Sequence, residues 1–137
     1  MYANKADIIY QAAGNAGNGV FQEAKDYNQT LPADKKVWVI GVDVDQSGLG
    51  NYTAKNGKKA NFTLTSVLKG LNVATKSIAD DAYNDKFPGG KHLVYGLKDN
   101  GVSITKGQLS DKAWQAVQKA RTQILDGKIK VATKPSK

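Results

Sequence analysis

Short apolar runs alternate along this chain with amphipathic segments. The runs are rich in valine, isoleucine and aromatic residues, which is typical of strands buried in a sheet. They lie at residues 7–13, 37–42, 61–66 and 92–97. Two of the segments between them carry apolar residues at helical spacing, so we expect a helix over 20–27 and another over 67–82.

The two later helices have further signals. In the segment 67–82 the inward positions are expected to be Leu71, Val73, Ala74 and Ile78. A third helix is expected to begin after Ser110, a residue suited to the N-cap, and to end at Gly127. Strands that alternate with helices predict an α/β fold with a mainly parallel sheet flanked by helices.

Glycine, asparagine and proline mark the connections. The turn 14–19 holds three glycines and leads directly into the first helix, while the polar segment 47–59 is expected to be an exposed loop. Asn100-Gly101 lies between the fourth apolar run and the residues 102–105. An Asn-Gly pair in that position predicts a late antiparallel hairpin.

Composition limits the class of protein. The 137 residues suit one domain, 1–137, with 40% hydrophobic residues and no cysteine, which excludes disulfides and thiolate sites. No segment has the apolar length of a membrane helix, and the polar start does not resemble an export signal. The formal net charge is +8, but lysines without interleaved aromatic residues indicate a solvated surface and no nucleic-acid partner. They are Lys55, Lys58, Lys59, Lys128, Lys130, Lys134 and Lys137.

Candidate ligand-binding residues follow the predicted strands, because ligands of open α/β sheets bind beyond the carboxyl ends of the strands. Gly14 and Gly17 lie in the first such loop, where glycine lets a backbone N–H approach a ligand, although the loop also suits a plain turn. Asp43 and Asp45 follow the second strand. An aspartate there is able to accept hydrogen bonds from a vicinal diol such as a ribose, while the other interpretation is a capping turn.

Other polar residues indicate a functional role less clearly. Lys69 is expected near the start of a helix, where the helix dipole disfavours a cation, so an anionic or polar group should compensate for it. His92 is the only histidine and has no partner for a triad or a metal site, which favours a surface or structural residue. No pair of residues offers a nucleophile with its base, so the sequence predicts no enzyme, no metal and no cofactor.

The order of these motifs resembles the basic membrane protein (BMP) family of ABC-transporter substrate-binding proteins. Residues 6–24 are similar to the family's strand, glycine loop and helix, and residues 39–46 and 65–69 to its next two motifs. Residues 95–102 are similar to its late hairpin. The resemblance covers nearly the whole chain.

This resemblance implies a type I periplasmic-binding-protein fold, of which the chain would be the three-layer carboxy-terminal lobe, with the amino-terminal lobe absent. It implies that Gly17 approaches a nucleoside, most often a purine nucleoside, that Asp43 or Asp45 holds the ribose hydroxyls, and that Lys69 contacts the ligand. It also implies an ABC permease as partner and a lipid-anchored parent protein at the extracellular face of the cell membrane. The exposed face between the lobes is a candidate dimer surface.

Two other functions remain open at this stage. A sugar- or nucleoside-responsive transcription regulator shares this lobe, but it also needs a DNA-binding domain upstream. A nucleotide-dependent α/β enzyme also uses a glycine loop at a helix N-terminus.

Overall fold

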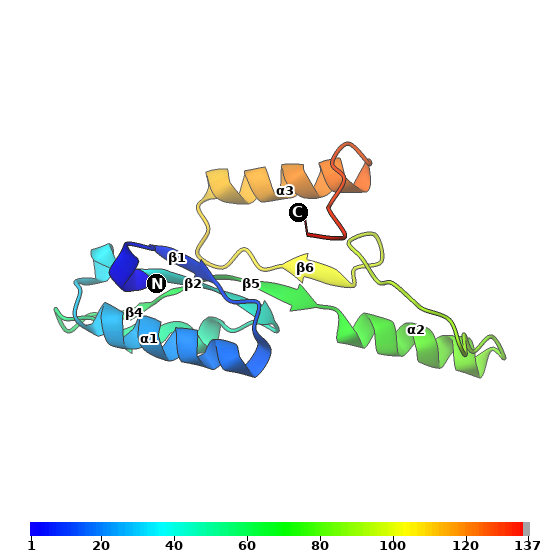
Figure 1. Cartoon of the computed structure of the whole chain (residues 1–137), viewed down its shortest axis with the longest axis horizontal. Coiled ribbons are helices and arrows are strands. Elements are labelled where there is room, and N and C mark those ends of the chain that lie inside the picture. Colours follow the sequence, from blue (N-terminus) through cyan, green and yellow to red (C-terminus); the bar gives the residue numbers. More distant parts are fainter. Residues whose placement is uncertain (136–137) are drawn as a thin grey trace. The chain divides into compact units, whose positions relative to one another are not determined.

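A computed structural model describes residues 1–135 (Figure 1). The chain divides into two compact units. Unit 1 comprises residues 1–69 with 103–108, and unit 2 comprises residues 70–102 with the segment from Leu109 onward. Four short 3-10 helices accompany the main elements, at Tyr2–Asn4, Gly14–Gly17, Ala33–Lys35 and Ser47–Gly50.

Unit 1 is built on a sheet with the strand order β1-β2-β5-β6. The strands are β1 (Ile8–Tyr10), β2 (Trp38–Asp43), β5 (Thr63–Lys69) and β6 (Val102–Ile104). The first three are parallel, with Ile9 opposite Val39 and Val42 opposite Val67. The predicted α/β fold with a mainly parallel sheet is therefore confirmed.

The last strand runs against this direction. Beyond β6, the N–H of Thr105 donates to the carbonyl of Ser66 at 3.0 Å, and the N–H of Gln108 donates to that of Leu64 at 2.8 Å. As the residue number rises from 105 to 108, the number of the hydrogen-bonded residue in β5 falls from 66 to 64. This is the pattern of an antiparallel pair.

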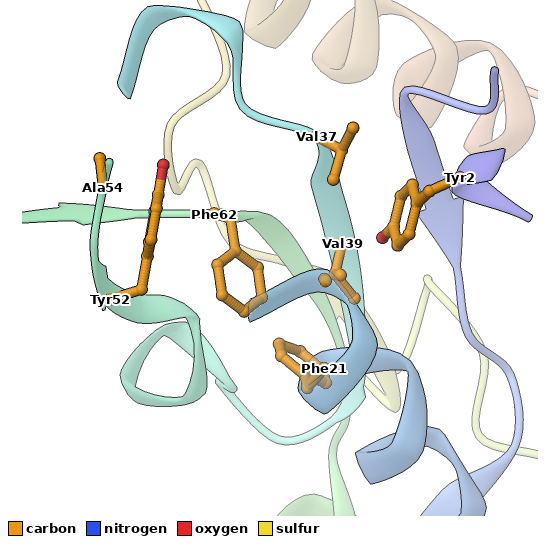
Figure 2. Close-up of a cluster of buried hydrophobic side chains, with 8 residues drawn as sticks. Tyr2, Phe21, Val37, Val39, Tyr52, Ala54 and Phe62 are labelled. Atoms are coloured by element: carbon orange, nitrogen blue, oxygen red, sulfur yellow. The ribbon is translucent and has the colours of Figure 1, made fainter. Parts of the chain in front are cut away.

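The core of unit 1 lies between the sheet and α1 (Asn18–Gln29), the helix predicted over 20–27. The ring centre of Phe21 in this helix lies 6.0 Å from the ring centre of Phe62 (Figure 2). The ring centres of Phe62 and Tyr52 lie 5.6 Å apart. Phe62 and Val39 are fully buried. Each such side chain contributes about 1.5–3 kcal/mol through the apolar surface that it removes from water.

Polar contacts fix the start of the sheet against α1. The buried side chain of Asn28 donates from Nδ2 to the carbonyl of Val37 at 3.0 Å, and its Oδ1 accepts from the N–H of Val37 at 2.8 Å. Tyr2 donates its hydroxyl to the carbonyl of Trp38 and stacks on the ring of Tyr27. These bonds fix the position of β2 along the axis of α1.

Residues 47–59, expected as an exposed loop, instead contain most of a hairpin. Its strands are β3 (Asn51–Thr53) and β4 (Lys59–Asn61), which pair antiparallel. Tyr52 and Ala54 are buried in the core, so the segment is anchored by its few apolar side chains. Because most residues of this segment are polar, the sequence pattern did not indicate that these apolar side chains are buried.

The boundary between the third strand and the second helix is later than expected. The strand β5 continues through Lys69, because Val67 and Leu68 pair with Val42 and Asp43 of β2. In unit 2, α2 (Leu71–Tyr83) begins only after Gly70. Leu71, expected to face inward, is 67% exposed.

The strand expected at 92–97 is absent from the described part of unit 2, so the late hairpin prediction is wrong in this detail. The Asn-Gly turn forms, but it closes on Gly96, whose carbonyl accepts from the N–H of Gly101 at 2.9 Å. The third helix is confirmed as α3 (Asp111–Leu125), with the hydroxyl of Ser110 accepting from the N–H of Ala113. Gly127 follows it with φ 73°, as a residue that ends a helix should.

The first strand is less buried than its sequence predicts. Ile8 and Tyr10 are 49% and 53% exposed, since β1 is the terminal strand of the sheet and α1 packs against its other face. The lysines noted above are exposed where the structure describes them, and Lys137 lies outside the described residues. Within residues 1–135, no helix has the length and apolar character needed to cross a membrane.

Candidate functional site

A cavity of about 210 Å³ opens in unit 1 where the three parallel strands end. Of the residues that line this cavity, two come from the end of β2, two from β5, and the others from β1 and the loop after it. The lining residues are Tyr10, Ala12, Gly14, Val42, Asp43, Val67 and Lys69. This is the edge at which open α/β sheets bind their ligands.

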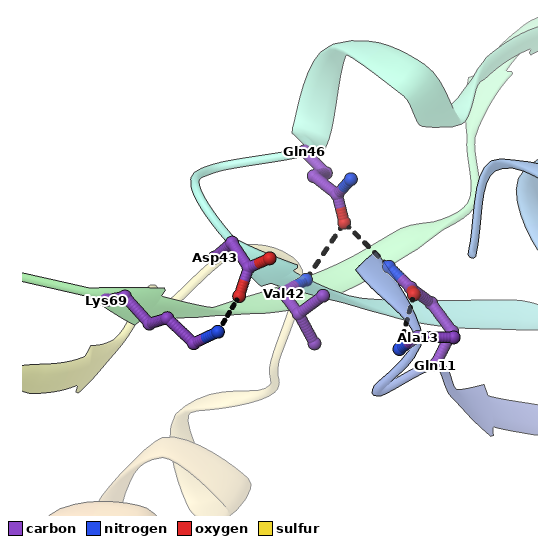
Figure 3. Close-up of polar contacts among 6 residues, drawn as sticks. All are labelled: Gln11, Ala13, Val42, Asp43, Gln46 and Lys69. Carbon is purple, nitrogen blue, oxygen red and sulfur yellow. Dashed lines mark hydrogen bonds and ion pairs between the residues drawn. The ribbon is translucent and has the colours of Figure 1, made fainter. Parts of the chain in front are cut away.

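The two charged residues of the cavity form an ion pair. Nζ of Lys69 lies 2.7 Å from Oδ1 of Asp43 (Figure 3), with side chains 63% and 40% exposed respectively. The parallel register explains their meeting, because Asp43 stands opposite Leu68, the neighbour of Lys69. The hydrogen bond from Lys69 to Asp43, and then the negative charge of that carboxylate, raise the pKa of the Lys69 ammonium.

Lys69 had been expected beside a helix N-terminus, with an anionic group nearby to compensate for its charge. The position is corrected, since Lys69 is the last residue of β5, but the compensating group is present and is Asp43. Asp43 leaves its carboxylate partly open to solvent as an acceptor, and Lys69 adds donors beside it. The cavity therefore offers both halves of a hydrogen-bonding pair to a polar ligand.

The backbone at Asp43 is strained. Its φ is 72°, a value rare outside glycine, and the N–H of Val44 donates to the carbonyl of Val42 at 2.8 Å across it. A three-residue turn closed by such a bond with positive φ at its centre is the uncommon form of the γ-turn. Strain of this kind costs about 1–3 kcal/mol and is concentrated at functional sites.

The structure brings some of the candidate residues together. Gly14, Asp43 and Lys69 line one cavity, with Gly14 in the left-handed region at φ 52°. Gly17 and Asp45 are not among its lining residues.

Gly17 and Asp45 have structural surroundings of their own. Gly17 is buried, and a β-carbon added there would lie 1.7 Å from Oε1 of Gln11. Asp45 accepts from the N–H of Ser47 at 2.9 Å, which is the capping turn considered from the sequence. Of the two aspartates, Asp43 is the one at the cavity.

Sequence reasoning missed the aromatic and glutamine residues near the site. Tyr10 forms one wall of the cavity, together with Val42 and Val67, yet in the sequence these residues are only parts of apolar runs. Gln11 is 4% exposed, and a polar residue inside an apolar run was the available signal for it.

A metal site finds no support in the described residues. Within residues 1–135 no group of three or more histidine, cysteine, aspartate or glutamate side chains is placed to hold a metal ion. His92 is exposed in the segment without regular structure. The polar groups that line the cavity, Asp43 and Lys69, offer hydrogen bonding to a ligand.

Comparison with known proteins shows the family to which this chain is similar. Residues 1–134 match the family model described as ABC transporter substrate-binding protein PnrA-like (Bmp). The chain is 46% identical to the "ABC transporter nucleoside-binding protein BmpA" of Lactococcus lactis subsp. cremoris, and 42% identical to a "CD4+ T-cell-stimulating antigen" of Listeria monocytogenes. Each match covers 98% of this chain and 38% of the relative, so the chain spans well under half the length of these curated relatives.

Solved structures share the fold at lower identity. An ABC transporter solute-binding protein from Aeropyrum pernix K1 matches with a TM-score of 0.69 and 21% identity, over 99% of this chain and 43% of that one. A transcriptional activator of the comK gene from Bacillus halodurans matches with a TM-score of 0.72 and 19% identity, over 93% of this chain and 40% of that one. At such identities the likeness concerns the fold alone.

Proposed function

Because the chain belongs to the family of PnrA-like ABC transporter substrate-binding proteins, we propose that it is one lobe of a receptor that captures nucleosides outside the membrane for an ABC importer. The name of the Lactococcus lactis relative supports the nucleoside. The match to 38% of that relative's length supports a single lobe. We propose that residues 1–137 are the carboxy-terminal one.

The observation that carries this proposal is the convergence of Asp43, Lys69 and Gly14 on one cavity. A carboxylate accepts hydrogen bonds from two neighbouring hydroxyls, as a ribose presents them, and the ammonium of Lys69 donates to a remaining sugar oxygen. The ion pair has no net charge, and Asp43 would repel a phosphate. These features favour a nucleoside over a nucleotide.

The size of the cavity supports a site that is only half present. Closed sites for small molecules usually measure about 300–1,000 Å³ and bury most of the ligand. The cavity here measures about 210 Å³, and Tyr10 and Lys69 on its wall are largely exposed. We propose that this lobe holds the ribose, while a second lobe covers the base when the two close.

Calorimetry tests the proposal, with guanosine, adenosine, inosine and guanosine monophosphate titrated into this chain and into the two-lobed protein that carries it. The two-lobed protein should bind a nucleoside at least about tenfold more tightly than the monophosphate. The chain alone should bind weakly, because it encloses one side of the ligand. Micromolar binding by these 137 residues alone would contradict the division into lobes.

A pair of matched variants tests the role of the carboxylate. Asp43→Asn keeps a side chain that tolerates positive φ but removes the charge, and it should weaken nucleoside binding at least about tenfold. Asp45→Asn alters the neighbouring turn and should leave the affinity within about twofold. Equal losses in both variants would show that the loop, not the Asp43 carboxylate, matters.

The remaining parts of the proposal concern the whole receptor. Its relatives are substrate-binding proteins, so we propose a binding protein without catalytic activity, with a permease as partner and a lipid anchor at the extracellular face of the membrane. A copy without its second lobe would expose the face around the cavity, which a second copy would cover as a dimer. The regulator remains the alternative, supported only by a likeness of fold.

A further inference from the structure

A cluster of polar side chains lies behind the ion pair and outside the cavity lining. Oε1 of Gln46 accepts from the backbone N–H of Val42 at 2.9 Å and from Nε2 of Gln11 at 3.0 Å (Figure 3). The backbone N–H of Gln46 donates to Oγ of Ser66 at 3.1 Å, and Ser66 is fully buried. The loop after β2 is therefore tied to β5 and to Gln11, the residue that follows β1.

These bonds close the loop around the strained turn. The side chain of Gln46 folds back onto Val42, the residue before Asp43, while the backbone of Gln46 is held by β5. Both sides of the turn at Asp43 are thus fixed. The packing is close, because a β-carbon at Gly41 would lie 2.7 Å from Oγ of Ser66 and 2.8 Å from Oε1 of Gln46.

Gln11 extends the same cluster to the glycine loop. Its Oε1 accepts from the N–H of Ala13 at 3.4 Å, while its Nε2 donates to Oε1 of Gln46. Gly17 leaves the space that the buried Gln11 side chain fills. Two glutamine side chains consequently join the loops that carry Gly14 and Asp43.

We propose that Gln46 is a positioning residue of the ligand site, with Gln11 as its partner: they brace the reversed backbone at Asp43 and so keep its carboxylate directed at Lys69 and the cavity. A strained turn relaxes when its support is removed, and a relaxed turn would aim the carboxylate elsewhere. What that carboxylate binds rests on the proposed function. The brace itself is a property of the unliganded chain.

The first test therefore uses no ligand. An NMR titration of the Lys69 side chain, assigned by its loss in Lys69→Met, reports whether Asp43 still lies beside it, because Asp43 raises the pKa of that ammonium. Asp43→Asn should return the Lys69 titration to that of an ordinary lysine. Gln46→Met, which keeps the length but removes the acceptor, should do the same in part, and Gln46→Glu, which keeps an acceptor oxygen, should not.

Gln11→Met and Gln22→Met complete this test. Gln11→Met keeps the length of the side chain but removes the Nε2 donor to Oε1 of Gln46 and adds no charge, so it should lower the Lys69 pKa as Gln46→Met does. Gln22 lies on the exposed face of α1 and bonds Asp26, so Gln22→Met should change nothing. If Gln46→Met and Gln11→Met fold and keep the wild-type Lys69 titration, the brace is refuted, whether or not the protein binds nucleosides.

The second test compares guanosine with 2′-deoxyguanosine in the two-lobed protein. A misdirected carboxylate should cost Gln46→Met at least about tenfold in guanosine affinity but at most about threefold for the deoxynucleoside, with Gln46→Glu near wild type. In the Asp43→Asn background, Gln46→Met should add little, since both changes remove the same contact. Equal losses for both ligands, additive with Asp43→Asn, would indicate general damage to the fold and overturn the positioning role.

If wild type bound neither ligand, the proposed function would fail, and the Lys69 titration would still decide the brace. A raised pKa that falls in Gln46→Met would support it, and one that stays raised would refute it.

Discussion

Nζ of Lys69 lies 2.7 Å from Oδ1 of Asp43, although the two residues end different strands of the sheet. Side chains this exposed gain little stability from an ion pair, about 0–1 kcal/mol. Their pairing therefore matters for where it places a donor and an acceptor, not for how firmly it holds the sheet. The backbone at Asp43 is the costlier part of the arrangement.

Replacing Asp43 by glycine should stabilise the fold while removing the carboxylate. Glycine adopts φ 72° without strain, so we expect the free energy of unfolding to rise by about 1 kcal/mol. Asp43→Asn should change it by less than about 0.5 kcal/mol, because asparagine tolerates positive φ almost as aspartate does. Urea denaturation of the three proteins measures both values, and a clear loss of stability in Asp43→Gly would mean that the turn stores no strain.

Two glycines two residues apart should respond to alanine in opposite directions. Gly17→Ala places a methyl group 1.7 Å from Oε1 of Gln11 and should cost about 1–3 kcal/mol in unfolding free energy. Gly19→Ala lies within α1, where the new carbon would meet no atom within 4 Å apart from its chain neighbours and the nearby backbone of the helix, and alanine should stabilise the helix there by up to about 1 kcal/mol. Thermal unfolding separates the two.

The cause of the Gly17 effect can be isolated with a second change. In Gln11→Ala the side chain that fills this space is gone, so adding Gly17→Ala should cost less than it does in the wild type. Equal costs in both backgrounds would point to the backbone at Gly17 and away from Gln11.

Removing the Asn28 side chain should be strongly destabilising. Asn28→Ala leaves both the N–H and the carbonyl of Val37 without their buried partner, at a cost of about 2–4 kcal/mol. Thr30→Ala, at the end of the same helix, removes an exposed hydroxyl bond and should cost less than about 0.5 kcal/mol. Chemical denaturation gives both numbers, and similar values for the two variants would contradict the role of Asn28.

Stability should fall in alkaline solution through Tyr2. Burial, and then the charge of Glu23, raise the pKa of Tyr2 from the ordinary tyrosine value of 10.0 to about 12. The unfolded chain loses this proton first, so the folded state loses about 2 kcal/mol as the pH rises from 10 to 12. Tyr2→Phe, less stable at neutral pH by about 1 kcal/mol for its lost hydrogen bond, should show a smaller decline, and the remainder is expected because burial also raises the pKa of Tyr52.

The control for this pH dependence is Tyr83→Phe. Tyr83 is 90% exposed, so its removal should leave the alkaline decline as in the wild type. A decline of equal size in Tyr2→Phe would assign it to other groups.

The sequence predicted those features that depend on local pattern. The periodicity of residues 20–27, the N-cap at Ser110 and the alternation of strand and helix were sufficient for α1, α3 and the mainly parallel sheet. Failures occurred where tertiary contacts decide. The end of β5 is set by its pairing with β2. The residues after the Asn-Gly turn pair with β5, which is distant in sequence, and residues 92–97 form no strand.

The site was predictable in part for the same reason. Asp43 and Lys69 follow from the rule that ligands meet the carboxyl ends of parallel strands. The brace of Gln11 and Gln46 joins residues 35 positions apart, and no local signal links the two. Gly17, which does not line the cavity, packs closely against the same buried Gln11 side chain.

The position of β1 at the end of the sheet order leaves one row of its backbone donors and acceptors free to pair with another strand. Ile8 and Tyr10 are about half exposed, so a second copy that pairs with β1 in concentrated solution would also bury their apolar surface. The formal charge of +8 opposes such an encounter, but only over the Debye length, about 10 Å at 0.1 M salt and about 30 Å at 0.01 M. Dilute buffer should therefore keep the copies apart, and added salt should promote their association.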